Sequence, residues 1–310
     1  IFIKRIKYYL RKNYDIVHII DQSNAIYTPQ IKKQSNAPVL ITCHDLIAIR
    51  QAKNEFKKAP KVSKTGKILQ SWIHKSLKIA DYYACDSEQT KNDLNRIIPS
   101  SLWHSKVIYM GTEFKIENAK SPKYKEEKLS FNILSTRFIL HVGSAAWYKN
   151  RKAVFQAFRY AKLQNQSNNL KLVLVGPSPQ ADEIDASLKK WLDNNTKDII
   201  SVTNTSDQVL QELYINAEFL IFPSHIEGFG WPPLEAALSG CPVICTKTGA
   251  IHDLLGKNAR YVNPKDQSSI NKLVSEVLQK QNMRSHKVSL PTNKQCQEEY
   301  YNLYQRLIKK

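Results

Sequence analysis

One segment, between Phe222 and Val243, constrains the fold more than any other part of this 310-residue chain. It reads FPSHIEGFGWPPLEAALSGCPV, with the apolar run AEFLIFPS at its start and the run CPVICT at its end. Short apolar runs of this kind are typical of buried strands. Between them, Pro232 and Pro233 suit the first turn of a helix, and Gly240 suits the left-handed position at its end. The segment therefore predicts a strand, a glycine loop, a helix and a second strand, which is the repeating unit of a parallel α/β sheet.

Two carboxylates lie eight positions apart in this segment: Glu227 in the glycine loop and Glu235 just inside the helix. Ligands of parallel sheets bind at the carboxyl ends of the strands, where this loop falls. Glycines allow close backbone approach, and a helix N-terminus favours a negative group. An ionised carboxylate only accepts hydrogen bonds, so Glu235 suits a pair of hydroxyls. A lone Glu is more often a solvated or first-turn residue, but the whole pattern favours a sugar-nucleotide site.

The form EGFGWPPLEAALSGCPVI resembles the E-x7-E signature of family 4 retaining glycosyltransferases. The resemblance implies the α/β GT-B fold, with two Rossmann-like domains facing a cleft. It implies that Glu227 faces the donor sugar and that Glu235 holds the ribose hydroxyls. It also implies backbone contacts to the sugar and the diphosphate from Gly228, Phe229 and Gly230. The expected donor is a nucleotide-diphosphate sugar, with no metal and no other cofactor.

A second candidate site follows the predicted strand FILHVGS, which ends at Gly143. The helix after it has an apolar face made of Val154, Phe155, Phe158 and Ala161. Lys149, Arg151 and Lys152 lie at the start of this helix, where positive charge opposes the helix dipole unless an anion is near. The cluster therefore indicates a diphosphate site, and the alternative is a solvated basic turn in a chain with 46 Lys and Arg.

The family resemblance assigns roles to these residues. Lys149 matches the lysine that holds the donor diphosphate. Ser144, directly after Gly143, stands where the family often has an arginine. Either Arg151 takes over that role, or the diphosphate is held less tightly. The segment 202–204 is expected to lie under the nucleotide base.

The first half of the chain also has the pattern of a Rossmann-like domain. The runs APVLITCHDL, ADYYACDSEQTKNDL and KVIYMGTEF resemble family landmarks and follow in the family's order. His44 lies at the end of the first of these predicted strands. An isolated histidine there is more often structural, but the resemblance implies that His44 contacts the transferred sugar. Asp45 beside it either orients the imidazole or an acceptor hydroxyl, or caps a turn.

The expected domains are an acceptor-side domain (1–130), a nucleotide-sugar-binding domain (131–290) and a C-terminal helix (291–310) that returns toward the first domain. A charged linker is predicted at about 116–131. The chain opens at Ile1 without the family's usual first strand and glycine-rich loop. We therefore expect an incomplete first domain, and an inactive or truncated nucleotide-sugar-binding protein is an alternative function.

The net charge of the chain does not decide which class of partner it binds. The formal net charge is +19, and residues 50–78 carry nine basic side chains against one acidic one. Within them, GKILQSWIHKSLKIA predicts a helix with one apolar face, made of Ile68, Leu69, Trp72, Ile73, Leu77 and Ala80. Two interpretations are equally good: an interfacial membrane helix, or a core helix with a solvated lysine side. A basic first domain suits a lipid-linked acceptor at an anionic membrane surface.

Nucleic-acid binding is an alternative because the pI is near 9.6. The sequence shows no nucleic-acid module and no aromatic-basic stacking motif, so no nucleic-acid partner is expected. No apolar run approaches the roughly 18 residues of a spanning helix. Five scattered cysteines without zinc-type pairing indicate free thiols, and hence a reducing, cytoplasmic location. Peripheral contact with the inner membrane face is compatible with this location.

These observations predict a retaining glycosyltransferase that moves a sugar from a nucleotide-diphosphate sugar to an acceptor hydroxyl, in polysaccharide or glycolipid synthesis. The expected partners are the sugar nucleotide and a glycan or lipid-linked acceptor. The expected catalytic residues are Glu227, His44 and Lys149. A sugar-nucleotide epimerase is a further alternative, which the E-x7-E loop disfavours.

Overall fold

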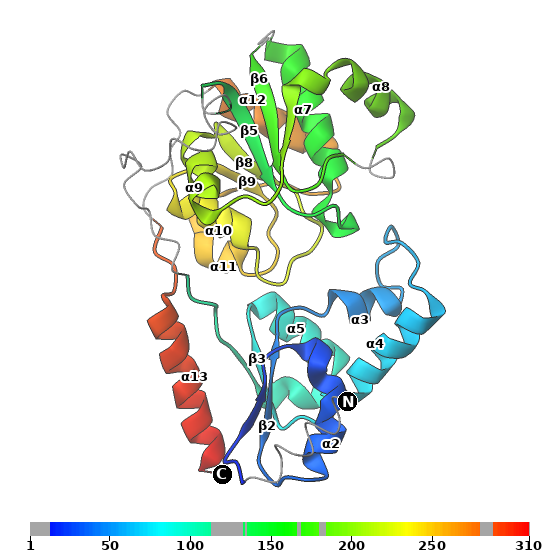
Figure 1. The fold of residues 1–310 in the computed structure, drawn as a ribbon, viewed down its shortest axis with the longest axis vertical. Coiled ribbons are helices and arrows are strands. Elements are labelled where there is room, and N and C mark those ends of the chain that lie inside the picture. The colour runs from blue at the N-terminus through cyan, green and yellow to red at the C-terminus, as the bar shows by residue number, and fades with distance from the viewer. Residues whose placement is uncertain are drawn as a thin grey trace. The chain divides into compact units, whose positions relative to one another are not determined.

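The computed structural model describes residues 13–112, 133, 135–165, 169–179, 184–279 and 288–309. Its contacts divide the chain into two compact units. The first unit is Ile1–Glu113, Glu227–Phe229 and Pro291–Lys310; the second is Phe114–Ile226 and Gly230–Leu290. Each unit contains one parallel sheet with helices packed on it (Figure 1). Apart from Ile133, the predicted linker and the residues next to it lie outside the described residues.

The sheet of the first unit has four parallel strands in sequence order. They are β1 (Val17–Ile19), β2 (Val39–Cys43), β3 (Tyr82–Cys85) and β4 (Ser105–Val107). Leu40 pairs with Tyr82, and Tyr83 pairs with Ser105. β2 and β3 are completely buried, as expected for central strands covered on both faces.

Helices cover both faces of this sheet. They are η1 (Gln22–Tyr27), α2 (Thr28–Lys32), α3 (Ile47–Ala52), α4 (Lys64–Leu77), α5 (Glu88–Ile97), η2 (Pro99–Trp103) and α13 (Asn293–Ile308). On one face, Ile73 and Leu77 of α4 and Leu94 of α5 join a core with the sheet. On the other face, Leu303 and Leu307 of α13 pack on the sheet. The C-terminal helix is therefore part of the first unit.

The sheet of the second unit has six parallel strands in the order β10-β9-β8-β5-β6-β7. They are β5 (Arg137–Val142), β6 (Leu170–Val175), β7 (Ile199–Val202), β8 (Phe219–Phe222), β9 (Val243–Cys245) and β10 (Arg260–Tyr261). The strand order reverses between β5 and β8, where Ile139 pairs with Phe219. In doubly wound sheets the ligand crevice lies at the carboxyl ends of the strands at such a switch point.

The helices of the second unit fall on two faces of its sheet (Figure 1). They are η4 (Trp147–Lys149), α7 (Arg151–Asn165), α8 (Ala186–Asn194), η6 (Thr196–Asp198), α9 (Asp207–Asn216), α10 (Trp231–Leu238), α11 (Ile251–Leu255), η7 (Gly256–Asn258) and α12 (Gln267–Gln279). α7 and α12 pack together on one face, and α9 and α10 lie on the other. The apolar face predicted for α7 is buried, with Phe155 and Phe158 in the core.

The predicted strand–loop–helix–strand unit is present as β8, α10 and β9. Prolines occupy the first turn of α10 as expected. Gly230 precedes α10 with a φ of 96°, and a Cβ there would lie 2.5 Å from Cγ1 of Ile251. Gly240 follows the helix with a φ of 74°. Both positions therefore require the left-handed backbone that glycine adopts without strain.

The apolar residues predicted on one face of the helix at 66–80 are not equally covered. Ile73 and Leu77 are buried, but Ile68, Leu69 and Trp72 are 69%, 44% and 50% exposed. The helix α4 packs against η1, α3 and α2, and its Ile73 and Leu77 join the core of the first unit. Its apolar residues are therefore divided between a buried side and an exposed one, a distinction that the sequence pattern does not contain.

Candidate functional site

The switch point of the second sheet brings together the chain segments that leave β5 and β8. Gly143 directly follows β5, and its N–H donates to the carbonyl of Val175 at 3.0 Å. The N–H of His225, beyond β8, donates to the carbonyl of Tyr148 in η4 at 2.7 Å. Asn150 Nδ2 donates to the carbonyl of Pro223 at 3.0 Å. The bonds of Tyr148 and Asn150 tie the segment just before α7 to the start of the loop that contains the E-x7-E motif, and the bond of Gly143 holds it to the end of β6.

Glu235 is held in place on α10 by a residue that the sequence did not single out. Tyr214 of α9 is fully buried, and its hydroxyl donates to Oε2 of Glu235 at 2.9 Å. Burial raises the pKa of the Glu235 carboxyl, and the bond from Tyr214 partly offsets that rise. The orientation of Glu235 is therefore fixed before any ligand arrives. The only sequence signal for Tyr214 is its place in the family-like pattern SDQVLQELYINA.

The three cations predicted to share one anion site have different surroundings. Lys149 ends η4, and its Nζ lies 5.1 Å from the centre of the Phe222 ring. Arg151 is only 2% exposed, and its Nη2 donates to the carbonyl of Pro177 at 2.6 Å. Lys152 forms an ion pair with Asp185 at 3.0 Å. Lys149 lies near Gly143. Arg151 contacts the loop after β6, which lies next to Gly143, and Lys152 pairs with Asp185 at the start of α8.

His141, in β5, is a buried histidine that the sequence pattern did not indicate as a site residue. Its Nδ1 lies 2.9 Å from the carbonyl of Ile221, which can only accept, so Nδ1 carries the proton. Its Nε2 is buried and has no hydrogen-bond partner among the described residues. A Cβ built on Gly143 would lie 3.4 Å from this Nε2. Burial, followed by the charges of Arg151 and Lys149, lowers the pKa of His141 to about 4. The ring is thus a neutral acceptor beside the predicted diphosphate segment.

His44 belongs to the first unit and has the opposite electrostatics. Its Nδ1 lies 2.6 Å from Oδ2 of Asp86, and its Nε2 lies 2.9 Å from the carbonyl of Ile20. Both partners only accept hydrogen bonds, so both ring nitrogens must carry protons. The bond to Asp86 is the largest cause that raises the pKa of His44 to about 9. Asp86 is 1% exposed, and burial raises the pKa of its carboxyl. At neutral pH the pair is an imidazolium and a carboxylate.

Three residues of the E-x7-E loop group with the first unit, namely Glu227–Phe229. Within that unit, Ser87 Oγ donates to the carbonyl of Gly228 at 2.8 Å. A Cβ on Gly228 would lie 2.3 Å from the carbonyl oxygen of His44, so no other residue fits without a backbone shift. Glu227 and Phe229 are 7% and 5% exposed. The remaining predicted donor residues, from Gly143 to Glu235, belong to the second unit.

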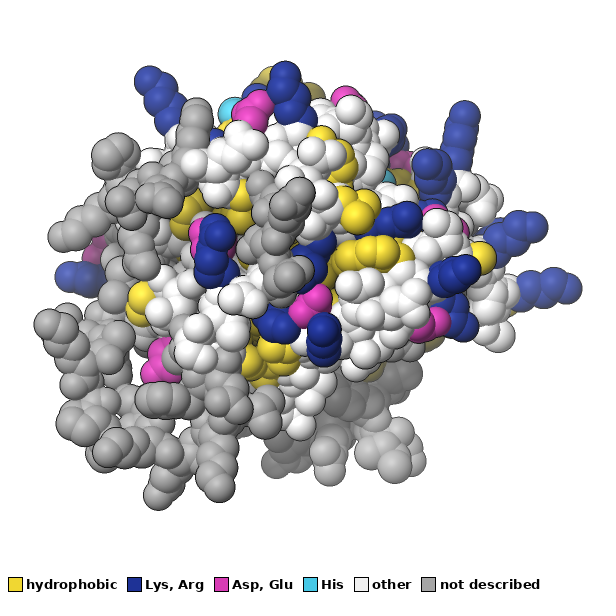
Figure 2. Space-filling view, turned by 90° about the horizontal axis from the view of Figure 1, so that it is seen from above, with side chains coloured by type: hydrophobic (Ala, Val, Ile, Leu, Met, Phe, Trp, Pro, Cys, Tyr) yellow, Lys and Arg dark blue, Asp and Glu magenta, His cyan; other side chains and the backbone are white. Residues whose placement is uncertain are grey.

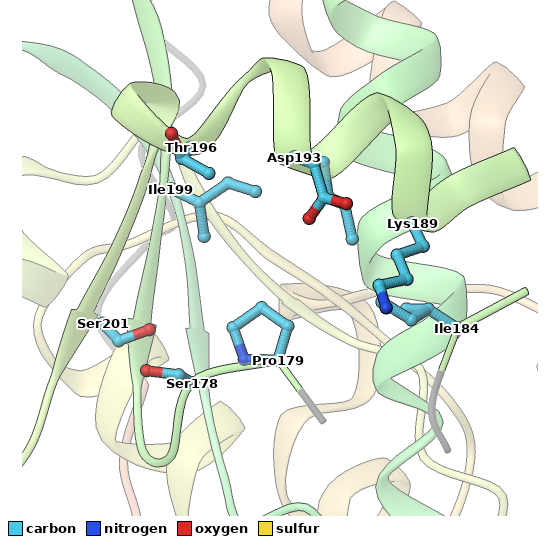
Figure 3. Close-up of a pocket in the computed structure, with 9 residues that line it drawn as sticks. Ser178, Pro179, Ile184, Lys189, Asp193, Thr196, Ile199 and Ser201 are labelled. Atoms are coloured by element: carbon cyan, nitrogen blue, oxygen red, sulfur yellow. The ribbon is translucent and has the colours of Figure 1, made fainter. Parts of the chain in front are cut away.

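A cavity of about 540 Å³ lies at the edge strand β7 of the second unit (Figure 3). Its lining includes Ser178 and Pro179, the pair Lys189 and Asp193 on α8, and Ser201 on β7. None of the predicted donor residues lines it. The cavity is therefore separate from the switch point between β5 and β8.

The charged side chains on the face seen in Figure 2 are spread out. Figure 2 shows Lys and Arg side chains scattered over the visible face, with Asp, Glu and apolar side chains between them. Within the described part of the chain, no group of three or more His, Cys, Asp or Glu side chains could hold a metal ion. Nor does any described helix have the length and apolar character needed to cross a membrane.

The solved structures most like this chain include sucrose-phosphate synthase from Thermosynechococcus elongatus, with a TM-score of 0.69 and 20% identity. The match covers 99% of this chain and 77% of that one. A structure described as trehalose-6-phosphate from E. coli, bound with UDP-2-fluoro glucose, gives a TM-score of 0.63 at 12% identity, over 95% and 69% of the two chains. These neighbours have the GT-B fold, so the predicted fold class is confirmed.

Sequence relatives agree with this fold. An O-antigen chain mannosyltransferase of Salmonella typhimurium is 31% identical over 143 residues, which are 46% of this chain and 38% of the relative. A capsular polysaccharide biosynthesis glycosyltransferase of Staphylococcus aureus is 26% identical over 216 residues, 67% and 56% of the two chains. The matches thus cover less than two thirds of either relative. The family described as glycosyl transferases group 1 matches residues 124–289, more than half of the chain. The chain belongs to this family.

Proposed function

We propose that this chain transfers a sugar from a nucleotide-diphosphate sugar to a hydroxyl of a glycan or lipid-linked acceptor, with retention at the anomeric carbon, as a family 4 enzyme. The observation that carries the proposal is the switch point between β5 and β8, which places Gly143, Lys149 and the start of the E-x7-E loop at one edge of the sheet. The relatives' names support polysaccharide synthesis as the setting. The UDP-2-fluoro glucose bound by a structural neighbour supports a nucleotide-sugar donor.

Charge develops on the leaving diphosphate as the glycosyl–phosphate bond breaks. Lys149 and the backbone N–H groups at the start of α10 stabilise that charge in this proposal. The donor contacts also include Ser144, Gly228 and Phe229. Protein cations neutralise the diphosphate, so no metal is required. Arg151 acts indirectly, because its guanidinium is buried against the Pro177 carbonyl and shapes the loop after β6.

Glu235 and Glu227 have separate roles in the proposal. Glu235 accepts hydrogen bonds from the two ribose hydroxyls, and Tyr214 keeps its carboxylate in the required orientation. Glu227 positions the sugar ring. His44 is protonated at neutral pH, so it does not act as a general base. In this proposal its Nε2–H leaves the Ile20 carbonyl and donates to a sugar oxygen, while Nδ1–H stays on Asp86.

The proposed location is the cytoplasm, at the inner face of the membrane when the acceptor is lipid-linked. All five cysteines are free thiols, and four of them are buried, which fits a reducing compartment. The scattered surface charge offers no continuous basic stripe on the visible face, so nothing there favours nucleic-acid binding (Figure 2).

Calorimetric titration with a panel of nucleoside diphosphates, without added metal, tests the donor site. We expect one diphosphate to bind saturably. Glu235→Ala should weaken that binding at least about tenfold, since it removes charge-assisted hydrogen bonds to the ribose. Glu276→Ala, at an exposed position of α12, is the matched control and should bind like the unsubstituted chain. A folded sample that binds none of the diphosphates would contradict the proposal.

Sugar transfer tests the division between the two carboxylates. Glu227→Ala should keep nucleotide binding and lose transfer, because its partner is the sugar and not the nucleotide. The anomeric configuration of the product, read by NMR, tests retention. Equal loss of nucleotide binding in Glu227→Ala and Glu235→Ala would show that the assigned roles are wrong. Nucleotide binding without transfer by the unsubstituted chain would identify an inactive nucleotide-sugar-binding protein.

A further inference from the structure

The helix α4 has a second apolar side that faces away from the core. Its inner side contributes Ile73 and Leu77, which are 4% and 0% exposed. Ile68 and Trp72 lie one turn apart on the outer side, and Ile79 continues the same line just beyond the helix. These three side chains are 69%, 50% and 42% exposed. Packing in the core explains the apolar residues on the inner side of α4 but not those on its outer side.

Lysines flank this outer apolar line. Residues 56–80 contain seven lysines and no Asp or Glu. The four within or next to the helix, Lys64, Lys67, Lys75 and Lys78, are all exposed. An apolar line that includes a tryptophan, flanked by lysines on a folded helix, is the pattern of an interfacial membrane helix.

A second exposed apolar pair extends the pattern. Leu102 and Trp103 in η2 are 53% and 80% exposed, and one residue, His104, separates them from β4. Ile79 precedes β3, which pairs with β4 in parallel. The amino ends of parallel neighbours lie at the same edge of a sheet, so Ile79 and Trp103 share that edge. We call Ile68, Trp72, Ile79, Leu102 and Trp103, with the flanking lysines, the α4 surface.

We propose that the α4 surface docks on an anionic lipid bilayer. The lysines match anionic headgroups in charge, and the apolar side chains enter the boundary between headgroups and acyl chains. A second copy of this chain is a poor occupant, because it would bring the seven lysines of each copy together without an acidic partner. The surface contains none of the donor residues, so its assignment does not depend on the reaction proposed above.

Sedimentation of the full 310-residue chain with lipid vesicles tests the proposal. We expect binding to vesicles of phosphatidylcholine and phosphatidylglycerol in equal parts. Vesicles of phosphatidylcholine alone should bind at least about tenfold more weakly, and added salt should weaken binding to the mixed vesicles. Neither measurement needs a donor sugar or turnover, so vesicle binding and sugar transfer can fail separately.

Two sets of variants separate the apolar and the charged contributions. Ile68→Ser with Trp72→Ser should lower binding to mixed vesicles at least about tenfold. Lys64→Gln, Lys67→Gln and Lys75→Gln together should lower it by about tenfold or more. The matched controls are Leu163→Ser on α7, at a side chain that is 63% exposed, and Lys257→Gln with Lys272→Gln in the second unit. Both controls should bind like the unsubstituted chain.

Three outcomes would overturn the proposal. The first is a folded, unsubstituted chain that does not bind mixed vesicles. The second is equal binding by the α4-surface variants and the controls, with circular dichroism showing that all are folded. The third is a self-associating chain that Ile68→Ser with Trp72→Ser converts to monomer in sedimentation equilibrium, which would assign the surface to a second copy.

Discussion

His44 and His141 lie at the carboxyl ends of strands in two parallel sheets, yet the structure gives them opposite charge. His44 has a carboxylate on one nitrogen and a carbonyl on the other, and its pKa is raised to about 9. His141 has a carbonyl on one nitrogen and no described partner on the other, and burial lowers its pKa to about 4. The difference lies in Asp86, which has no counterpart on the unpaired nitrogen of His141. Whether a histidine at a strand end is a cation or a neutral acceptor therefore depends on whether a carboxylate contacts its ring.

The largest expected effect is a loss of folding stability at acid pH, which we attribute to His141. Its pKa is about 4 in the folded chain and 6.5 without the fold, so the unfolded chain binds the extra proton between these values. Stability is thus kept above pH 6.5 and lost as pH falls toward 4, by about 3 kcal/mol for this fully buried ring. His141→Leu should remove this acid-dependent loss of stability. It should also cost about 1 kcal/mol at neutral pH, because the hydrogen bond from His141 to the Ile221 carbonyl is lost. Urea unfolding across this pH range measures both changes.

The control for this experiment is a histidine in the same unit that is not buried. His252 lies exposed on α11. His252→Leu should lose stability at acid pH to the same extent as the unsubstituted chain. His141→Asn should keep a donor for the Ile221 carbonyl and so lose less stability at neutral pH than His141→Leu. If the free energy of unfolding of His141→Leu falls with pH as steeply as that of the unsubstituted chain, His141 is not the buried neutral group described above.

The next effect tests the other half of the comparison. Asp86→Asn keeps the size of the side chain and removes its charge, so the pKa of His44 should fall from about 9 toward 6.5. The raised pKa stabilises the fold fully below pH 6.5, and this contribution is lost as pH rises through 9. Because the His44 side chain is 38% exposed, we expect a loss of only about 1–2 kcal/mol at neutral pH. NMR titration of the His44 ring gives its pKa directly.

Glu299→Gln is the matched control for Asp86→Asn. It removes a carboxylate that pairs with Lys106, and both side chains of that pair are exposed. It should change stability by less than about 1 kcal/mol and leave the titration of His44 unchanged. If Asp86→Asn also leaves that titration unchanged, Asp86 is not what makes His44 a cation.

The sequence predicted the parts of this fold that depend on local chemistry. Prolines and glycines around residues 230–240 set the ends of α10, and short apolar runs set β8 and β9. The partners of the site side chains were not predicted. Asp86 reaches His44 across 42 positions, and Tyr214 reaches Glu235 across 21. Such pairs depend on which strands and helices are neighbours, and periodicity in one sequence does not contain that information.

The sequence also predicted which residues of α4 are apolar but not what covers them. Ile73 and Ile68 look alike in a helical pattern, although one is 4% and the other 69% exposed. Ile73 belongs to the core that α4 forms with the sheet and neighbouring helices, whereas Ile68 does not. The sequence left open an interfacial membrane helix and a core helix with a solvated lysine side. The structure shows the core packing of Ile73 and Leu77, and the membrane interpretation stays a prediction.

The smallest expected effect concerns a third histidine, His18. It shows whether the charge of a histidine depends on the unit it belongs to or on the groups around its ring. His18 lies in the same sheet as His44, but its ring nitrogens contact hydroxyls, from Tyr304 at 2.7 Å and Thr42 at 2.8 Å. Hydroxyls can donate or accept, so they do not require a protonated ring. Burial is the largest cause that lowers the pKa of His18 to about 4. Two histidines of one unit therefore differ in charge: burial and the charge of His44 keep His18 neutral, whereas the Asp86 carboxylate makes His44 a cation.

Tyr304→Phe tests this last step. It removes one hydroxyl from the His18 ring and should cost about 1 kcal/mol, because the ring keeps its bond to Thr42. The loss should appear in urea unfolding and in faster amide exchange of α13, whose Leu303 and Leu307 pack on the same sheet. Tyr301→Phe, at a ring on α13 that is 62% exposed, is the matched control and should change neither. Equal effects of the two substitutions would mean that the His18–Tyr304 bond does not hold α13 on the sheet.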